Sequence, residues 1–348
     1  MPKVPRTVRY EPGRVILIDQ RRLPDELTFL ECSTVEDVAR AIETMAVRGA
    51  PAIGVTAALG LALAAEVSGA RDRESLLRDL REAAERLRRT RPTAVNLFWA
   101  IDRVMRAAES AEGGAEDVRR AVVEEALKMA EEDVETNRRI GELGAELIED
   151  GSTVMTICNA GSLATVWYGT VTAPMYVAWE RGVRFRVVAL ETRPVLQGAR
   201  LTSFELSAEG IPVTLIVDGA AGHYMRERGV DLVLVGADRI LRDGTVFNKI
   251  GTYSLAVLAR EHGVPFFSVA PTSTFDMVSD RSDVKIEERP REEVASFRGV
   301  KVAPDRVEVY NPAFDMTPPE YLTGIVTELG ILYQPLRLSI ARALGRRS

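Results

Sequence analysis

The sequence has few of the residues on which disulfide frameworks, metal centres and histidine-based catalysis depend. It contains two cysteines and two histidines in 348 residues. Two cysteines cannot form a disulfide framework or a structural zinc cluster, and His223 and His262 are too far apart in the sequence for a HExxH metal motif. We therefore expect no bound metal. The chemistry of Cys32 and Cys158 has to be judged separately, and Cys32, inside a small apolar segment, is expected to be structural.

Motifs for nucleotide binding and segments for membrane insertion are also missing. There is no Gly-x-Gly-x-x-Gly fingerprint and no Walker A sequence, so we expect no nucleotide cofactor and no nucleotide-dependent oxidoreductase. The longest apolar run, residues 50–65, has 16 residues and two glycines, which is too short for a bilayer span and indicates a buried helix. Basic residues near the N-terminus are not followed by an apolar core, so no signal peptide is expected. These absences predict a cytoplasmic protein that does not bind membranes.

The composition that is present is that of an ordinary globular protein. Hydrophobic residues make up 46% of the chain and charged residues 28%. A net charge of -6 at pH 7 disfavours nucleic acid as a partner. A phosphorylated metabolite is still compatible with this charge, because a local cluster of Arg, Lys and backbone N–H groups can outweigh it. The length favours two domains.

The chain changes its pattern near residue 150. Residues 1–135 predict a mostly helical N-terminal domain with a short β start, in which Ser33 and Glu36 form a capping box. Residues 136–348 predict a Rossmann-like α/β domain with a parallel sheet, because short apolar runs alternate with helical stretches at the spacing of βαβ units. The expected strands, whose unbroken apolarity suits burial on both faces, are 153–157, 185–190, 213–217, 232–237 and 265–270.

Reactive or acidic residues directly follow four of these expected strands. They are Cys158, Glu191, Asp218 and Asp238. In open parallel α/β sheets, ligands bind beyond the carboxyl ends of the strands. An acid that merely caps the following helix explains any single position equally well, but the four positions together favour a functional site.

Cys158 and Asp238 are the strongest candidates for catalysis. A helix expected to begin near Ser162 would stabilise the thiolate of Cys158 through its dipole, although an inert buried cysteine is the alternative. The carboxyl of Asp238 is expected to be partly desolvated at the mouth of an apolar strand, which suits proton transfer. Simple pairing with Arg239 or Arg242 is the alternative for this carboxyl.

Candidate ligand-binding residues lie where helices are expected to begin. Asn248 and Lys249 are expected to open one helix, where an anion or a sugar hydroxyl could bind. Two groups precede prolines at other helix starts, where N–H groups and a guanidinium suit a phosphate. These groups are Arg48 with Gly49 and Ala50, and Arg91 before Pro92. A solvated surface arginine is the alternative in each group.

Seven blocks of the sequence closely resemble the methylthioribose-1-phosphate isomerase family. The blocks are RGAPAIGV (48–55), RPTAVNLFWAIDRV (91–104), CNAGSLAT (158–165), ETRPVLQGARLTSFEL (191–206), GADRI (236–240), NKIGTYSLAVLA (248–259) and YNPAFDMTP (310–318). They occur in order and with appropriate spacing, so the resemblance covers most of the chain. The wider superfamily includes ribose-1,5-bisphosphate isomerases and the regulatory subunits of the translation factor eIF2B.

The resemblance implies a fold, a reaction and a set of site residues. It implies a helical N-terminal domain and a Rossmann-like C-terminal domain in a protein that is commonly a homodimer and uses no metal or nucleotide. Cys158 matches the cysteine that assists the transition state, and Asp238 matches the proton donor. The positions that match substrate contacts are Arg48, Gly49, Ala50, Arg91, Gln197, Asn248 and Lys249. The implied reaction converts 5-methylthioribose-1-phosphate into 5-methylthioribulose-1-phosphate in methionine salvage.

Positions beside these blocks depart from the usual family pattern. They are Ile157, the stretch after Asp218, and the bulky pair Trp167 and Tyr168. They leave two related substrates open as alternatives, 5-deoxyribose-1-phosphate and ribose-1,5-bisphosphate. A non-catalytic regulatory subunit like those of eIF2B is the alternative from a different class, and the retained Cys158 and Asp238 argue against it.

Overall fold

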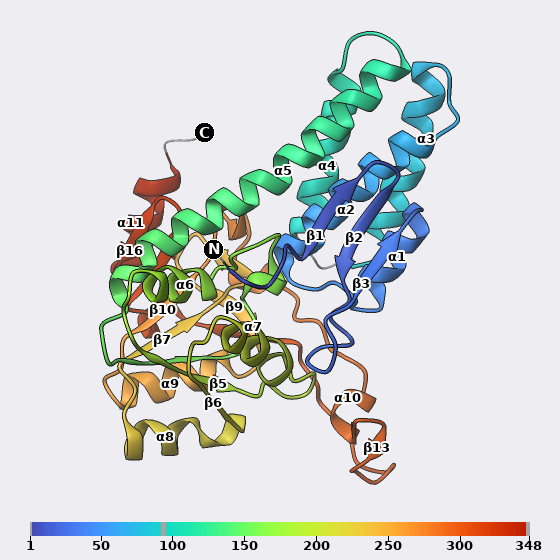
Figure 1. Cartoon of the computed structure of the whole chain (residues 1–348). Coiled ribbons are helices and arrows are strands. Elements are labelled where there is room, and N and C mark those ends of the chain that lie inside the picture. Colours follow the sequence, from blue (N-terminus) through green and yellow to red (C-terminus); the bar gives the residue numbers. More distant parts are fainter. Residues whose placement is uncertain (1, 92–94, 346–348) are drawn as a thin grey trace. The chain divides into compact units, whose positions relative to one another are not determined.

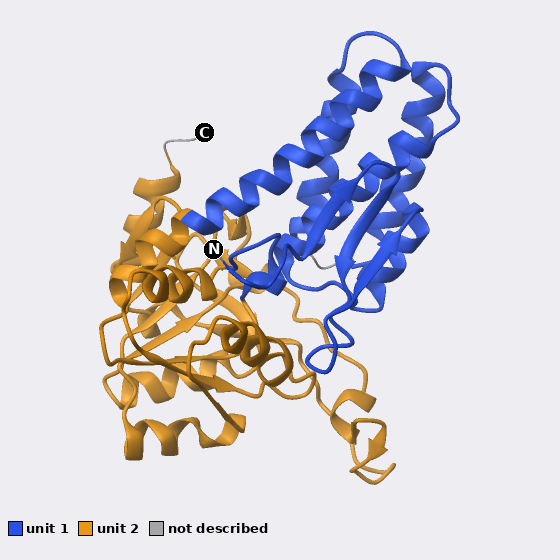
Figure 2. Ribbon diagram, in the orientation of Figure 1, with its two compact units in different colours: residues 1–138, 161–169 blue, residues 139–160, 170–348 orange. Residues whose placement is uncertain are grey.

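The structure is a computed structural model that describes residues 2–91 and 95–345, so Pro92 lies outside the described residues. The chain forms two compact units (Figure 2). Unit 1 comprises the residues up to 138 together with 161–169, and unit 2 comprises 139–160 and the residues from 170 onward.

Residues 161–169 were expected in the C-terminal domain but belong to unit 1. Their backbone is bonded to the start of the chain, because the N–H of Thr7 donates to the carbonyl of Val166 at 2.9 Å. The side-chain amide of Gln20 also donates to the carbonyl of Leu163, at 2.7 Å. Long-range hydrogen bonds of this kind leave no mark in the local pattern of the sequence.

Unit 1 combines a small antiparallel sheet with five helices among its described residues (Figure 1). The strands are β1 (Val8–Glu11), β2 (Arg14–Ile18) and β3 (Phe29–Cys32). The helices are α1 (Val35–Glu43), α2 (Ala50–Val67), α3 (Arg73–Arg88), α4 (Val95–Ser110) and α5 (Ala115–Gly144). Helix α2 is long and apolar enough to cross a membrane, but residues 52–65 are all buried inside the unit. Its apolar character on every side therefore reflects a central position in the core, as the sequence predicted.

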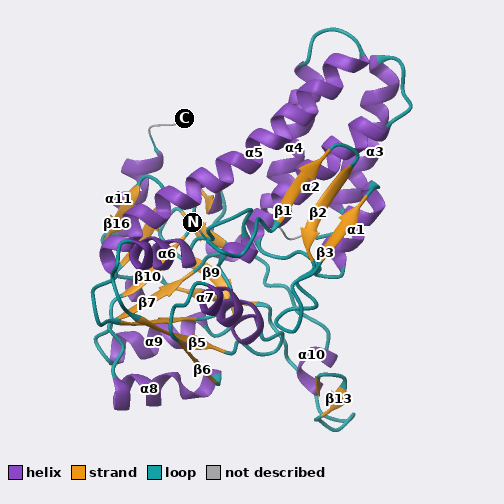
Figure 3. Ribbon diagram, in the orientation of Figure 1, coloured by secondary structure: helices purple, strands orange, loops and turns teal. Residues whose placement is uncertain are grey.

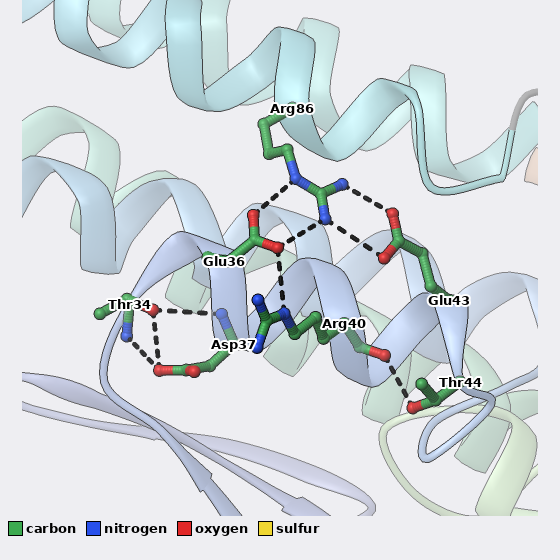
Figure 4. A network of polar contacts seen from close by, with 7 residues as sticks. All are labelled: Thr34, Glu36, Asp37, Arg40, Glu43, Thr44 and Arg86. Atoms are coloured by element: carbon green, nitrogen blue, oxygen red, sulfur yellow. Dashed lines mark hydrogen bonds and ion pairs between the residues drawn. The ribbon is translucent and has the colours of Figure 1, made fainter.

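Helix α1 begins one residue later than the predicted capping box. Thr34 is the N-cap: its hydroxyl accepts the Asp37 N–H at 3.1 Å, and the Asp37 carboxylate accepts the Thr34 N–H at 3.0 Å. The predicted pair of Ser33 and Glu36 was wrong, because Glu36 instead accepts from Arg86 of α3 at 2.7 Å. Arg86 also donates to Glu43 and so joins both ends of α1 to α3 (Figure 4).

Unit 2 contains a mainly parallel sheet whose strand order is β16-β15-β10-β7-β4-β5-β6. The strands are β4 (Thr153–Thr156), β5 (Arg186–Leu190), β6 (Val213–Ile216), β7 (Leu232–Val235), β10 (Phe266–Val269), β15 (Gly324–Thr327) and β16 (Gly330–Tyr333). All five predicted strands are present and parallel to their neighbours, whereas β16 runs antiparallel to β15. Burial on both faces was wrong for β6, because this strand forms the sheet edge and exposes Thr214 and Leu215.

Helices cover both faces of this sheet (Figures 1 and 3). They are α6 (Thr172–Glu180), α7 (Ser203–Ala208), α8 (Ala221–Arg228), α9 (Thr252–Glu261) and α11 (Leu336–Leu344). Met155 and Val233 of the sheet share one apolar core with Leu255 of α9 and Ile340 of α11. On the opposite face, Gly144 at the end of α5 approaches Pro174 of α6, together with Val326 of β15. The unit is thus doubly wound, as expected of a Rossmann-like domain.

The structure also contains short strands outside the main sheet that were not predicted from the sequence. A second sheet has the order β11-β8-β9-β14, with β11 (Phe275–Asp276), β8 (Arg239–Leu241), β9 (Val246–Lys249) and β14 (Phe314–Thr317). After α10 (Glu292–Ala295), β12 (Ser296–Phe297) and β13 (Val300–Lys301) form a hairpin. The second sheet matters for function, because β8 starts directly after Asp238 and β9 carries Asn248 and Lys249.

Candidate active site

Cys158 lies in the turn that follows β4 and is half-buried. Its backbone is left-handed, with φ of 65°. The helix expected near Ser162 was wrong: residues 157–171, all of which the structure describes, contain only the 3₁₀ turn Ser162–Ala164 before α6 begins at Thr172. A helix dipole therefore does not explain the chemistry of this thiol.

The peptide groups of Cys158 are held by threonine hydroxyls. Its N–H donates to Oγ1 of Thr192 at 2.8 Å, and its carbonyl accepts from Oγ1 of Thr202 at 2.6 Å. Thr192 and Thr202 are both buried. The position of the Cys158 backbone is thus fixed from the loop after β5 and from the short π-helical turn Gly198–Thr202.

The loops that carry Cys158 and Asp238 lie against each other in unit 2. Gly236, two residues before Asp238, is so close to the loop after β4 that a Cβ on it would lie 2.6 Å from Cβ of Ala160. Only a glycine fits at this approach without a shift of the backbone. Asp238 is half-buried, and its N–H donates to the carbonyl of Phe247 at 2.9 Å, which ties its loop to β9. The predicted catalytic pair therefore lies on loops that meet at the carboxyl edge of the sheet.

Asn248 and Lys249 end strand β9 and do not open a helix, so this part of the prediction was wrong. Helix α9 begins at Thr252, whose hydroxyl accepts from the Asn248 side-chain amide at 2.9 Å. The ammonium of Lys249 donates to the carbonyl of Ala313 at 2.9 Å and lies 5.0 Å from the ring centre of Phe314. These contacts with the backbone and ring hold a cation in place.

Asp315 is a supporting residue that the sequence analysis did not single out. It lies opposite Asn248 in the β9–β14 pairing, and its carboxylate accepts the N–H groups of Gly251 at 2.7 Å and Tyr253 at 3.1 Å. Burial raises the pKa of Asp315 to about 6. Asp315 caps α9 from a strand more than sixty positions away in the sequence, so the local sequence pattern does not predict this role.

Glu191 and Asp218 are brought together at the same edge of the sheet, as predicted from their positions after β5 and β6. Asp218 accepts the N–H groups of Thr192 and Arg193, each at 2.7 Å. Burial and, to a smaller extent, the charge of Asp218 raise the pKa of Glu191. Asp218 thus organises the backbone of the loop after β5, which is the loop that also holds Cys158.

Gln197 is buried in that same loop region. Its side-chain oxygen has no hydrogen-bond partner among the described residues. Buried polar atoms are nearly always paired, so an unpaired amide oxygen is suited to accept a hydrogen bond from a ligand. Within residues 2–91 and 95–345, no three His, Cys, Asp or Glu side chains form a group that could hold a metal ion.

The other predicted substrate contacts belong to unit 1. Gly49 is the N-cap of α2 with φ of 98°, and a Cβ there would lie 2.5 Å from the backbone of Ala164. Ala50 is the first residue of α2, and Nε of Arg48 lies 3.4 Å from the side-chain oxygen of Gln20. Arg91 is half-buried ahead of α4. The predicted helix start at Gly49 is confirmed, whereas the contact of these four residues with a substrate stays a prediction.

Comparison with known proteins identifies the family. Residues 46–334 match the model of the initiation factor 2 subunit family. The chain belongs to this family. Two methylthioribose-1-phosphate isomerases are similar to it over nearly its whole length. The one from Desulforudis audaxviator is 50% identical, with 97% of each chain covered, and the one from Geotalea uraniireducens is 49% identical, with 98% of this chain and 99% of the relative covered.

Solved structures of similar proteins share the fold. The 5-methylthioribose 1-phosphate isomerase from Pyrococcus horikoshii has a TM-score of 0.94 and 49% identity, covering 99% of this chain and 97% of its own. A protein from A. fulgidus that is called translation initiation factor eIF-2B, subunit delta, has a TM-score of 0.90 and 49% identity, covering 98% of this chain and 100% of its own. The resemblance and the fold class that the sequence predicted are confirmed.

Proposed function

We propose that the chain is an aldose–ketose isomerase that converts 5-methylthioribose-1-phosphate into 5-methylthioribulose-1-phosphate, a step of methionine salvage. The observation that carries the proposal is the likeness to isomerases of this name, at 49–50% identity and over 97–98% of the chain. The meeting of the Cys158 and Asp238 loops at the carboxyl edge of the unit 2 sheet supports it.

The reaction requires ring opening before isomerisation. The substrate carries its phosphate on the anomeric oxygen, so the sugar is a closed furanose without a free aldehyde. Asp238 acts as the acid that protonates the ring oxygen as the ring opens. This assignment suits a carboxyl that is partly withdrawn from solvent.

Hydrogen then moves from C2 to C1 by one of two routes. In the enediol route, the Cys158 thiolate removes the C2 proton, and a proton is delivered to C1. In the hydride route, hydrogen moves directly between the two carbons in a pocket shielded from water, and Cys158 stabilises the developing charge. In the enediol route, the Cys158 thiol returns the proton to C1. In both routes, the C2 hydroxyl loses its proton as the ketone forms, and the Asp238 carboxylate left by ring opening accepts it.

Within unit 2, binding of the phosphorylated sugar is assigned to Lys249, Gln197 and Asn248. Lys249 offers an ammonium group to an anion, and the unpaired oxygen of Gln197 suits a sugar hydroxyl. For Arg48, Gly49, Ala50 and Arg91 of unit 1, contact with the phosphate is implied by the family resemblance alone. Asn248, near the end of β9, is assigned as a further contact with the sugar.

Two alternatives are separated by one set of assays. The related sugars 5-deoxyribose-1-phosphate and ribose-1,5-bisphosphate are the competing substrates, and we expect both to give lower kcat/KM than 5-methylthioribose-1-phosphate. The name of the A. fulgidus structure, at 49% identity, favours a regulatory translation-factor subunit as the second candidate function. That candidate requires that none of the three sugars be turned over by folded protein.

We also propose that the chain works as a homodimer in the cytoplasm. The family resemblance supports the dimer, and the burial of the apolar helix α2 inside unit 1 agrees with a protein that does not insert into membranes. Sedimentation equilibrium tests the dimer. A mass of about 38 kDa, that of one chain, at all concentrations would contradict it.

A further inference from the structure

Two residues in rare backbone conformations face each other at the candidate active site. Cys158 has φ of 65°, and Thr192, which bonds to it, has φ of 66°. Left-handed backbone is uncommon in residues other than glycine and rarer still in β-branched residues such as threonine. Such conformations persist only where the surrounding contacts enforce them, and they gather at functional sites.

The contacts that enforce these conformations converge on the peptide groups of Cys158. The hydroxyl of Thr192 accepts the Cys158 N–H at 2.8 Å and donates to the carbonyl of Leu190 at 3.0 Å, so both of its hydrogen-bonding roles are used. Thr192 is in turn held by Asp218, which accepts its N–H at 2.7 Å. On the other side, the hydroxyl of Thr202 donates to the Cys158 carbonyl at 2.6 Å.

The residue after Cys158 is anchored by the same framework. The side-chain amide of Asn159 donates to Oγ1 of Thr202 at 3.1 Å and to the carboxylate of Glu205. Glu205 is completely buried and also accepts from the hydroxyl of Tyr176 at 2.9 Å. The carbonyl side of Cys158 is therefore attached to a buried polar network from α6 and α7, which limits its freedom to move.

We propose that Thr192 and Thr202 are positioning residues that hold Cys158 in its left-handed conformation, with Asp218 as the anchor of Thr192. Neither threonine needs to touch the substrate, because each acts through a peptide group of Cys158. The effect on turnover rests on the proposed function, in which Cys158 acts on the sugar. The effect on the thiol itself does not depend on that function.

The first test compares Thr192→Val, which keeps the shape but removes the hydroxyl, with Thr192→Ser, which keeps the hydroxyl. We expect Thr192→Val to lower kcat by on the order of 100-fold while KM changes little, because a misplaced catalytic group costs rate more than binding. We expect Thr192→Ser to recover most of the rate. Thr317→Val is the matched control, since Thr317 is a buried threonine of unit 2 whose hydroxyl has no partner among the described residues.

The second test needs no substrate. Iodoacetamide alkylation of Cys158 is followed by peptide mass spectrometry across a pH series, with Cys158→Ser to identify the labelled site. We expect the dependence of the alkylation rate on pH in Thr192→Val to differ from that in the wild type. In Thr192→Ser and Thr317→Val, this dependence should match that of the wild type. If the wild type does not isomerise the sugar but the alkylation profiles differ as expected, the proposed function fails and the positioning role stands.

Unchanged kcat and an unchanged alkylation profile in folded Thr192→Val would overturn the proposal. Circular dichroism shows whether each variant is folded. If Thr192→Val does not fold, Thr202→Val and Thr202→Ser decide the question from the carbonyl side of Cys158. A loss of kcat in Thr202→Val and its recovery in Thr202→Ser would support the positioning role. A wild-type kcat and alkylation profile in Thr202→Val would contradict it.

Discussion

At the residue scale, the proposed function requires that turnover depend most on Cys158 and Asp238. We expect Cys158→Ser and Asp238→Asn each to lower kcat by about 100- to 10,000-fold, the usual contribution of a positioned acid or base. Both side chains are only half-buried, so the variants should remain folded by circular dichroism. Near-normal turnover in either variant would remove that residue from the mechanism.

Lys249 is the residue of unit 2 that we expect to bind the phosphate. A charge-assisted hydrogen bond contributes about 1.5–3 kcal/mol, so Lys249→Ala should weaken binding of 5-methylthioribose-1-phosphate by about 10-fold or more. Titration calorimetry measures this, with unphosphorylated 5-methylthioribose as the comparison ligand. Lys301→Ala, which removes an exposed lysine paired with Asp305, is the matched control. Equal affinities of Lys249→Ala and the wild type would place the phosphate elsewhere.

The sequence predicts individual site residues well where their role follows from strand order. Glu191 and Asp218 were found because acids that follow neighbouring parallel strands meet at one edge. Asp315 was not found, because it caps α9 across a strand pairing that the sequence does not reveal. The helix expected near Ser162 is only the 3₁₀ turn Ser162–Ala164, since polar and glycine residues are common to turns and helix starts.

At the element scale, the N-terminus of α1 offers two possible capping boxes, of which the structure forms one. The stretch Ser33–Asp37 contains two overlapping capping boxes, and the structure uses Thr34 with Asp37. Composition alone cannot separate the two, because both pairs have a hydroxyl followed three residues later by an acid. In the structure, Glu36 accepts hydrogen bonds from Arg86 of α3 and from Arg40 within α1, and Asp37 is the acid of the capping box (Figure 4).

Removal of the observed cap should destabilise the protein. We expect Thr34→Ala to lower the free energy of unfolding by about 1 kcal/mol, the usual cost of losing an N-cap hydroxyl. Thr34→Ser should be close to the wild type. Ser33→Ala is the matched control and should change stability little, although the predicted capping box would have required the larger loss there. Urea denaturation followed by circular dichroism measures all three variants.

At the scale of the whole molecule, a buried carboxyl makes stability depend on pH. Asp133 of α5 accepts the N–H of Val166 at 2.7 Å, and burial raises its pKa from 3.8 to about 7. The folded chain therefore holds this proton more tightly than the unfolded chain does. The resulting stabilisation is fully present below pH 3.8 and is lost as the pH rises through about 7.

Asp133→Asn should remove this dependence. The variant keeps an oxygen that accepts the Val166 N–H but cannot titrate. We expect the wild type to lose about 4 kcal/mol from this group between these pH values, and the variant to show a correspondingly flatter profile. Chemical denaturation at a series of pH values measures both proteins. A slope that is the same in the two proteins would show that Asp133 titrates normally.

The fold class could be predicted from the sequence, but the contacts between segments far apart in the chain could not. Five strands of the main sheet were predicted because each is a short, largely apolar run, whereas β15 and β16 were not predicted. The second sheet was not predicted, since its strands are short and β11 and β14 join the local β8–β9 hairpin across large sequence distances. The membership of residues 161–169 in unit 1 depends on the same kind of distant contact, such as the bond from Thr7 to Val166.

The most direct test of the account is incubation of the purified chain with 5-methylthioribose-1-phosphate, without added cofactor, followed by carbon NMR. We predict the appearance of a ketone signal at C2 of the product, and its absence with Cys158→Ser. No ketone signal from folded wild-type protein would contradict the proposed isomerase activity on this sugar.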